Sequence, residues 1–122
     1  MYDITKKKIV WFYQSINSML TEKDYCDYET CVALYELGYD CQVIHLIAEK
    51  ITLYEAQKWL REEKFLLIVI DRLLNGEYVF SVVDILNYSE EKNGTANSYE
   101  EALSEGIKGA VKILKEELNE ET

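Results

Sequence analysis

Two apolar, β-rich runs meet at an Asn-Gly pair in this chain, and that pattern limits the folds open to it. Residues 65–74 and 77–87 are rich in Leu, Ile, Val, Tyr and Phe, and Asn75-Gly76 separates them. An Asn-Gly pair between two such runs is the strongest short-range signal for a β-hairpin, because both residues tolerate the positive φ of a tight turn. We therefore expect an antiparallel strand pair, with the rest of the chain covering it.

A two-residue turn at Asn75-Gly76 would set the register of this hairpin. It places Leu74 opposite Glu77 and Ile70 opposite Ser81, and side chains then alternate between the two faces. The face expected in the core carries Leu66, Ile68, Ile70, Val79, Val83 and Ile85. The second face carries Phe65, Leu67, Val69, Asp71, Tyr78, Phe80, Val82 and Asp84.

The second face is also mostly apolar, although two carboxylates interrupt it. A sheet that is open to water on one side usually alternates apolar and polar residues more cleanly. We therefore expect a helix or another chain to cover this face as well. A slip of one residue in the register would exchange the two faces.

The predicted fold is α+β, with a three-stranded antiparallel sheet in one domain that spans residues 1–122. The strands are expected at residues 41–48, 65–74 and 77–87. Helices 52–64 and 99–118 are expected on one face, with an N-terminal helix 5–20 and a short helix 28–37 as further cover. Residues 88–97 are expected to form a loop with a turn at Asn93-Gly94, and residues 116–122 to fray as an acidic tail.

Capping signals define three of these helices. Thr52 and Ser98 are each followed three residues later by a glutamate, Glu55 and Glu101, which is the capping-box pattern of a helix start. Gly38 stands where a helix ending near residue 37 needs a left-handed residue.

Gly106 and Ala110 are four residues apart on the apolar face of the last predicted helix. A glycine inside a helix costs about 1 kcal/mol relative to alanine. We expect it here because small residues let the helix backbone approach the sheet closely.

Composition and charge exclude several classes of protein. The chain has 122 residues, a formal net charge of −10 and a sequence pI near 4.6. Such an acidic chain repels nucleic acid and anionic membrane surfaces, so neither is expected as a partner. Its apolar runs are shorter than the ~20 residues of a membrane span. Three cysteines and no secretory signal predict reduced thiols and a cytoplasmic location.

A combination of motifs resembles a known group of proteins. Trp59-Leu-Arg-Glu62 runs into the strand pair, and Ser98-Tyr-Glu-Glu-Ala-Leu103 is followed by Gly106-Ile107. This pattern is similar to that of small uncharacterised proteins of Bacteroidetes and their phages, over roughly residues 27–114. The resemblance implies a shared fold and a mobile-element setting, and it implies no activity and no catalytic residue. The aromatic segment 9–20 departs from the shorter members of the group.

The residues that could carry chemistry are few. Cys26, Cys31, Cys41 and His45 lack the Cys-x-x-Cys spacing of a zinc site, so we expect neither a metal nor another cofactor. His45 is the one histidine, and no nucleophile motif or phosphate-binding loop accompanies it.

Aromatic residues suggest an interaction surface instead. They exceed what a small core must hold, and exposed aromatic side chains are typical of interfaces. We expect residues 9–20 to cover the second hairpin face, either within one chain or by exchange in a homodimer. The candidate interface comprises Trp11, Phe12, Tyr13, Tyr78 and Phe80, together with Asp71 and Asp84.

Three functions are consistent with these observations. We expect a non-catalytic binding or adaptor module that acts through protein–protein contacts, with another protein or a second copy as its partner. One alternative is an acidic inhibitor or nucleic-acid mimic, which requires carboxylates arrayed in two rows on one face. The other is a small enzyme that uses Asp71 and Asp84, which requires the two acids to converge in a deep pocket.

Overall fold

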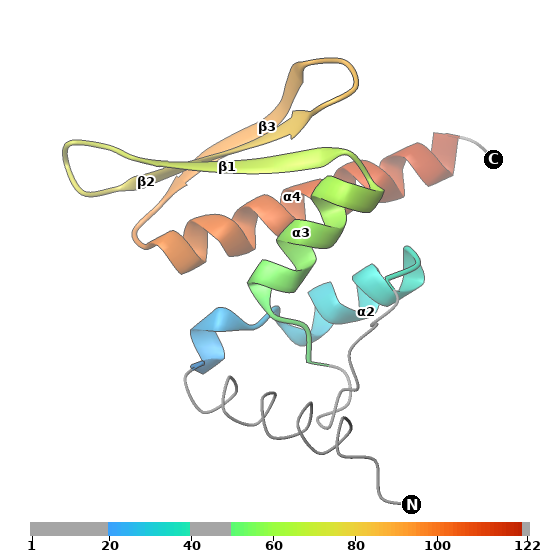
Figure 1. Cartoon of the computed structure of the whole chain (residues 1–122), viewed down its shortest axis with the longest axis horizontal. Helices are drawn as coiled ribbons and strands as arrows, with labels where there is room; N and C mark the ends of the chain where they lie inside the picture. The colour runs from blue at the N-terminus through green and yellow to red at the C-terminus, as the bar shows by residue number, and fades with distance from the viewer. Residues whose placement is uncertain (1–19, 40–49, 121–122) are drawn as a thin grey trace, which may run out of the picture.

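The protein is an α+β domain in which helices pack against one face of a three-stranded antiparallel sheet (Figure 1). The computed structural model describes residues 20–39 and 50–120. The predicted α+β class is confirmed, and the described residues form a three-stranded antiparallel sheet, as expected. The elements are η1 (Glu22–Asp24), α2 (Tyr28–Glu36), α3 (Leu53–Glu63), β1 (Leu66–Arg72), β2 (Tyr78–Asp84), β3 (Ser89–Ala96) and α4 (Tyr99–Glu120).

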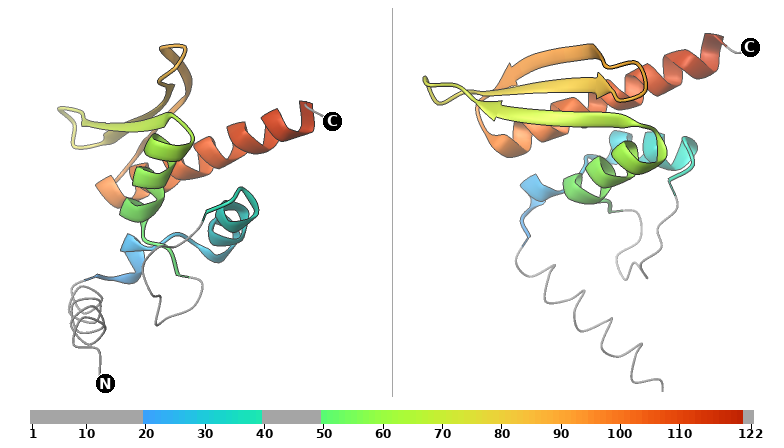
Figure 2. Two further views of the ribbon diagram at one scale, coloured as in Figure 1. Left: turned by 45° about the vertical axis from the view of Figure 1, so that its right-hand side comes forward. Right: turned by 45° about the horizontal axis from the view of Figure 1, so that its top comes forward.

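The helices lie on one side of the sheet in successive layers (Figures 1 and 2). Helix α4 runs beneath the sheet and contacts all three strands, whereas α3 contacts β1 and α4. Helix α2 packs on α4 farther from the sheet. The placement of α3 and α4 on one face is as predicted. None of the described helices is long and apolar enough to cross a membrane.

The hairpin is present, but its register differs by one residue from the predicted one. Leu73 N donates to Glu77 O at 2.7 Å, and Gly76 N donates to Leu73 O at 3.0 Å. The loop therefore has three residues, Leu74-Asn75-Gly76, and Gly76 takes the left-handed position with φ of 92°. Ile70 consequently pairs with Phe80 instead of Ser81.

This slip exchanges the two faces of β2 and leaves those of β1 as predicted. The inner face carries Leu66, Ile68 and Ile70 from β1 with Phe80 and Val82 from β2. Val79 and Val83, which were expected in the core, belong to the outer face with Leu67 and Val69. Because both faces are apolar, the hydrophobic pattern alone does not fix the register.

The third strand is β3, within the segment that was predicted to be a loop. It pairs antiparallel with β2, with a bulge between Val82 and Val83. Gly94 lies opposite Phe80, and a Cβ atom built on Gly94 would lie 2.7 Å from the Phe80 ring. The glycine that was expected to mark a turn therefore makes room for a ring in the sheet. The predicted strand 41–48 lies outside the described residues, as does the predicted N-terminal helix 5–20 apart from Leu20.

Helix α3 begins at its predicted cap, Thr52, and α2 ends before the predicted Gly38, whereas Asp27, which was not predicted as a cap, caps the start of α2. Asp27 Oδ1 accepts a hydrogen bond from Thr30 N at 2.8 Å, and Thr52 Oγ1 accepts one from Glu55 N at 3.0 Å. Gly38, with φ of 102°, follows the last turn of α2. The amides of Gly38 and Tyr39 bond back to carbonyls of that turn, which is a Schellman motif.

Helix α4 begins at its predicted cap and runs past its predicted end. Ser98 Oγ accepts from Glu101 N at 3.1 Å. The helix continues to Glu120, so residues 116–120, which were expected to fray, are helical.

The small residue in the middle of α4 has the expected role. A Cβ atom at Gly106 would lie 2.6 Å from Cγ2 of Ile68, which is a distance that real Cβ atoms do not adopt. Gly106, Ile68 and Ala110 are all buried. The helix backbone thus approaches β1 so closely that a side chain at position 106 has no space.

Candidate functional site

The outer face of the sheet is an apolar surface that the described helices leave uncovered. It is formed by every second residue of β1 and β2, and both described helices that touch the sheet lie on the opposite face. Val69, at the middle of β1, is 37% exposed. The face consists of Leu67, Val69 and Asp71 from β1 and Val79, Ser81 and Val83 from β2.

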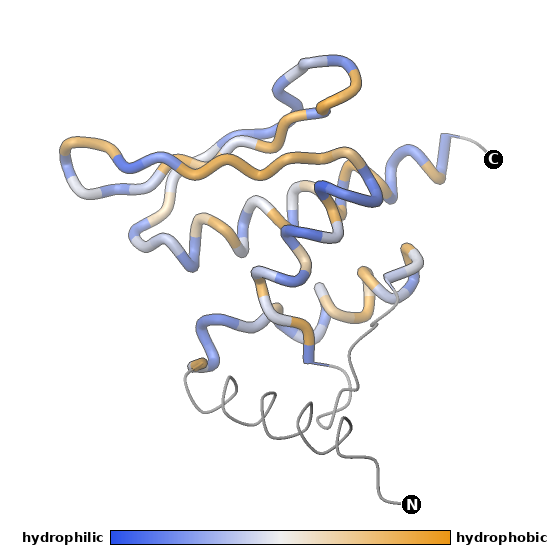
Figure 3. Tube along the Cα trace, in the orientation of Figure 1, coloured by the Kyte–Doolittle hydropathy of each residue, from blue (hydrophilic) through white to orange (hydrophobic). Residues whose placement is uncertain are grey.

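Two exposed leucines lie at the tip of the hairpin, beyond Asp71. Leu73, just before the three-residue loop, is 41% exposed, and Leu74 within the loop is fully exposed. Asn75 Oδ1 accepts a hydrogen bond from Glu77 N at 2.9 Å, which holds the loop in shape. Figure 3 shows an apolar tip that is separated from the apolar part of β1 by the hydrophilic end of that strand. The two leucines therefore project from a defined turn.

Polar residues border this surface. Asp71 lies on the outer face near the tip, opposite Val79. On the far side of β2, Glu90 pairs with Val83 and Asn93 pairs with Ser81. The result is an apolar stripe along β1 and β2 with an acidic rim.

Two of the aromatic residues predicted for the interface, Phe80 and Tyr78, make contacts within the described fold. Phe80 is buried, with 9% exposed, and packs against Gly94 on the inner side of the sheet. The ring of Tyr78 meets that of Tyr99 edge-on at 6.1 Å, at the start of α4. Phe80 therefore belongs to the core, and Tyr78 joins the sheet to a helix. Trp11, Phe12 and Tyr13 lie outside the described residues.

Asp71 and Asp84 do not come together. In the observed register Asp71 pairs with Val79 and Asp84 pairs with Leu66, so the two carboxylates belong to opposite faces. The prediction that they share a face is therefore wrong. Asp84 Oδ1 accepts a hydrogen bond from Leu86 N at 2.9 Å, and Oδ2 accepts one from Asn87 Nδ2 at 2.9 Å. These bonds hold the turn after β2.

The two described cysteines are buried thiols and do not form a reactive pair. Cys31 Sγ lies 3.7 Å from the carbonyl oxygen of Cys26. A hydrogen bond with Cys31, together with burial, raises the pKa of the Cys26 thiol far above its usual value. Such a thiol stays protonated at neutral pH and is a poor nucleophile. Cys41 and His45 lie outside the described residues, and the described residues contain no cluster that could hold a metal ion.

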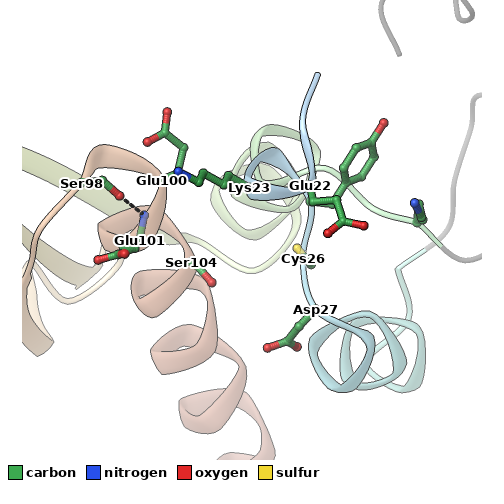
Figure 4. Close-up of a pocket in the computed structure, with 10 residues that line it drawn as sticks. Glu22, Lys23, Cys26, Asp27, Ser98, Glu100, Glu101 and Ser104 are labelled. Atoms are coloured by element: carbon green, nitrogen blue, oxygen red, sulfur yellow. Dashed lines mark hydrogen bonds between the residues drawn. The ribbon is translucent and has the colours of Figure 1, made fainter. Parts of the chain in front are cut away.

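A groove of about 510 Å³ lies between the first turn of α4 and the segment that leads into α2 (Figure 4). Its charged lining is mixed, with Glu22, Glu100 and Asp27 near Lys23 and Lys50. Figure 4 shows these side chains pointing in different directions, without a common point of approach. The groove is therefore a solvent-accessible surface cleft between two elements.

Asp27, one of the acidic residues that line this groove, has a structural role. Asp27 caps α2, and its Oδ2 lies 3.1 Å from Lys108 Nζ of α4. Hydrogen bonds from the Thr30 side chain and backbone, together with Lys108, hold the pKa of Asp27 below its usual value. The pKa of Lys108 is raised chiefly by its bond with Asp27. This ion pair joins α2 to α4.

Lysines interrupt the acidic residues along α4. Lys115 Nζ lies 3.8 Å from Glu36 Oε2, and Lys108 lies 3.8 Å from Glu105 Oε1. A mimic of nucleic-acid charge requires two unbroken rows of carboxylates. The described part of α4 instead carries both signs, which favours a solvated surface.

Comparison with known proteins gives no relative for this chain. No family model matches it, and no curated protein or solved structure matches it either. The resemblance to small proteins of Bacteroidetes and their phages therefore stays a prediction. The outer face of the sheet is the candidate interaction surface of the described residues.

Sequence reasoning missed three members of that surface. Val79 and Val83 were placed in the core, and Ser81 was paired with a core residue. The signal that could have found them is the alternative three-residue loop, because Gly76 fits the left-handed position in either loop length.

Proposed function

We infer that this chain is a non-catalytic protein-binding module and that the outer face of the sheet binds its partner. The observation that supports this inference is an apolar stripe along β1 and β2 with no described helix over it. A stripe of this kind, bordered by polar residues, is typical of a protein interaction site. The acidic rim at Asp71 and Glu90 suits a partner whose apolar patch carries basic residues around it.

The described residues offer little support for an enzyme. The two aspartates lie on opposite faces, the thiol of Cys26 is buried with a raised pKa, and the lining of the groove does not converge. Catalysis needs groups that act on one point. An interaction surface needs only shape, apolar area and a compatible rim, and the outer face provides these.

Photo-cross-linking in the native cells tests this proposal, with a matched control. Benzoylphenylalanine replaces Val69 on the outer face in one variant and Val32 on α2 in the other. Each valine is 37% exposed, so the two probes start from equal access to solvent. We expect the probe at position 69 to give a discrete adduct, which is lost when Val79→Lys is added in the same chain.

Two results would contradict the proposal. One is the same set of adducts from both probe positions, because that pattern reflects random collision. The other is an adduct between position 69 and another protein that persists in the Val79→Lys background, because a charge introduced into the apolar face must weaken binding there.

A further inference from the structure

The outer edge of β1 is a second structural feature, and its backbone groups are not part of the proposed binding face. Leu73 N donates to Glu77 O and Ile85 N donates to Phe65 O, so the odd-numbered residues of this strand bond to β2. In an antiparallel pair, the alternate residues direct their N–H and C=O groups the other way. Within the described sheet, β1 is a terminal strand. The residues that face its open edge are Leu66, Ile68, Ile70 and Arg72.

Helix α3 protects only the beginning of this edge. Gln57 Nε2 donates to Ile68 O at 3.2 Å. Figures 1 and 2 show that α3 meets the sheet at the start of β1 and leaves it at a steep angle. Among the residues that the structure describes, no hydrogen bond is made to the edge-facing groups of Ile70 or Arg72. A carbonyl oxygen has two lone pairs, so Ile68 O can also accept a second donor.

The two edges of the sheet differ in the features that prevent strand pairing. At the β3 edge there is a bulge in the ladder, and Glu90, Glu91 and Lys92 place charges along the strand. Bulges and charges of this kind keep edge strands from pairing with other chains. Strand β1 pairs with β2 without a bulge over seven residues, and its first five residues, Leu66–Ile70, carry no charge and no proline. Strand β1 is therefore regular enough to pair with another strand along its outer edge.

We propose that two copies of this chain pair along β1, antiparallel, about a two-fold axis at Val69. The occupant that fits is a second copy, because that copy carries the same regular apolar strand, with an outer edge that no other described strand covers. A two-fold axis at Val69 overlaps all seven residues and joins the two sheets into one of six strands. The edges that remain are then both β3, and both are charged and bulged.

The charges on β1 are compatible with this register. Asp71 faces Leu67 of the partner subunit, and the two Asp71 carboxylates lie about 13 Å apart along the strands at ~3.3 Å per residue. Each chain carries a net charge of −10, so general repulsion opposes association and salt screens that repulsion. The dimer is therefore expected to tighten as salt concentration rises.

The proposed dimer does not depend on the proposed binding face. Substitutions at Val69 and Val79 distinguish the two proposals. Val69 lies on the axis of the proposed dimer, where Val69→Lys puts two ammonium groups directly opposite each other. Val79 lies on the same outer face but on β2, away from the edge. Light scattering after size exclusion is expected to show twice the 14.3 kDa chain mass for the unaltered chain and for Val79→Lys. Val69→Lys is expected to raise the dissociation constant at least tenfold.

A cross-link tests the register itself. Residues that face each other without exchanging hydrogen bonds in an antiparallel pair lie close enough for a disulfide. Oxidation of Val69→Cys is therefore expected to give a covalent dimer much faster than oxidation of Val32→Cys, whose position is equally exposed. Circular dichroism establishes that each variant is folded before it is compared.

Three results would overturn the proposal. They are a chain that stays monomeric at millimolar concentration in high salt, a dimer that Val79→Lys disrupts as much as Val69→Lys does, and equal rates of cross-linking at positions 69 and 32. The second result would assign self-association to the outer face, so it would support face packing in place of edge pairing.

Discussion

Gly106 and Gly109 lie in the same helix, and the structure predicts opposite effects when each is replaced by alanine. Alanine gains about 1 kcal/mol of helix propensity over glycine at either position. A Cβ atom at Gly109 would meet Cγ2 of Val82 at 3.6 Å, which is an ordinary contact. At Gly106 it would lie 2.6 Å from Cγ2 of Ile68, which branches at Cβ and cannot move away without a change of rotamer.

The magnitude follows from these two contacts. Overpacking a buried site costs about 1–3 kcal/mol. Gly109→Ala is therefore expected to stabilise the protein by up to ~1 kcal/mol, and Gly106→Ala to destabilise it by up to ~2 kcal/mol. The propensity gain is common to both variants, so the difference between them isolates the cost of the clash.

Urea unfolding followed by circular dichroism measures this difference. With a urea dependence of ~1–3 kcal/mol per M, the two midpoints are expected to separate by roughly 1 M. Ile68→Leu removes the Cγ2 branch and provides a rescue, so Gly106→Ala is expected to cost less in that background than alone. If Gly106→Ala stabilises the protein as much as Gly109→Ala does, the close approach of α4 to β1 is refuted.

Three further changes have outcomes that the structure sets. The pKa of Asp27 is depressed in the folded protein. Its carboxylate therefore stabilises the fold above about pH 4, and this stabilisation is lost as the pH falls through the pKa of the folded state. Asp27→Ala is expected to cost ~1 kcal/mol in urea unfolding at pH 7 and clearly less near pH 2.5, and an equal loss at both values would contradict this role. Gly38→Ala is expected to lower stability by about 1–2 kcal/mol in the same assay, since alanine is strained at a φ of 102°, and an unchanged midpoint would count against that backbone. Cys26 and Cys31 are expected to resist alkylation until urea unfolds the chain, as mass spectrometry of the peptides would show, whereas rapid labelling of the native protein would disprove their burial.

Local signals in the sequence were sufficient for helices α2, α3 and α4. Thr52, Ser98 and Gly38 mark helix ends through hydrogen bonds and backbone angles that depend on a few neighbouring residues. The glycine at position 106 could also be interpreted, because a costly residue inside a helix needs a packing reason. These predictions succeeded because each rests on contacts that are close in sequence or on a single close approach.

The sheet was harder to predict because its pairing depends on contacts between strands. Asn75-Gly76 fits a loop of two or three residues, and with both faces apolar no burial pattern chooses between them. Strand β3 has the sequence Ser-Glu-Glu-Lys-Asn-Gly-Thr-Ala, which has little intrinsic preference for a strand. It becomes a strand through its pairing with β2 and its contact with α4.

The candidate surface was predicted in kind but not in its residues. An apolar second face was expected, and the outer face does carry Leu67 and Val69. Its other members changed with the register, so Phe80 moved to the core and Val79 and Val83 took its place. A shift of one position in a hairpin therefore changes the residues of the candidate surface more than it changes the fold.

The three-residue bend at the hairpin tip has an evolutionary consequence. Leu73 and Glu77 already pair on either side of it, so a chain that lacked Leu74 would keep every cross-strand partner and turn through Asn-Gly alone. A single-codon deletion there would remove one leucine from the surface and leave the strand pairing intact. Differences in length at this point among related genes would thus be a poor guide to whether their sheets differ.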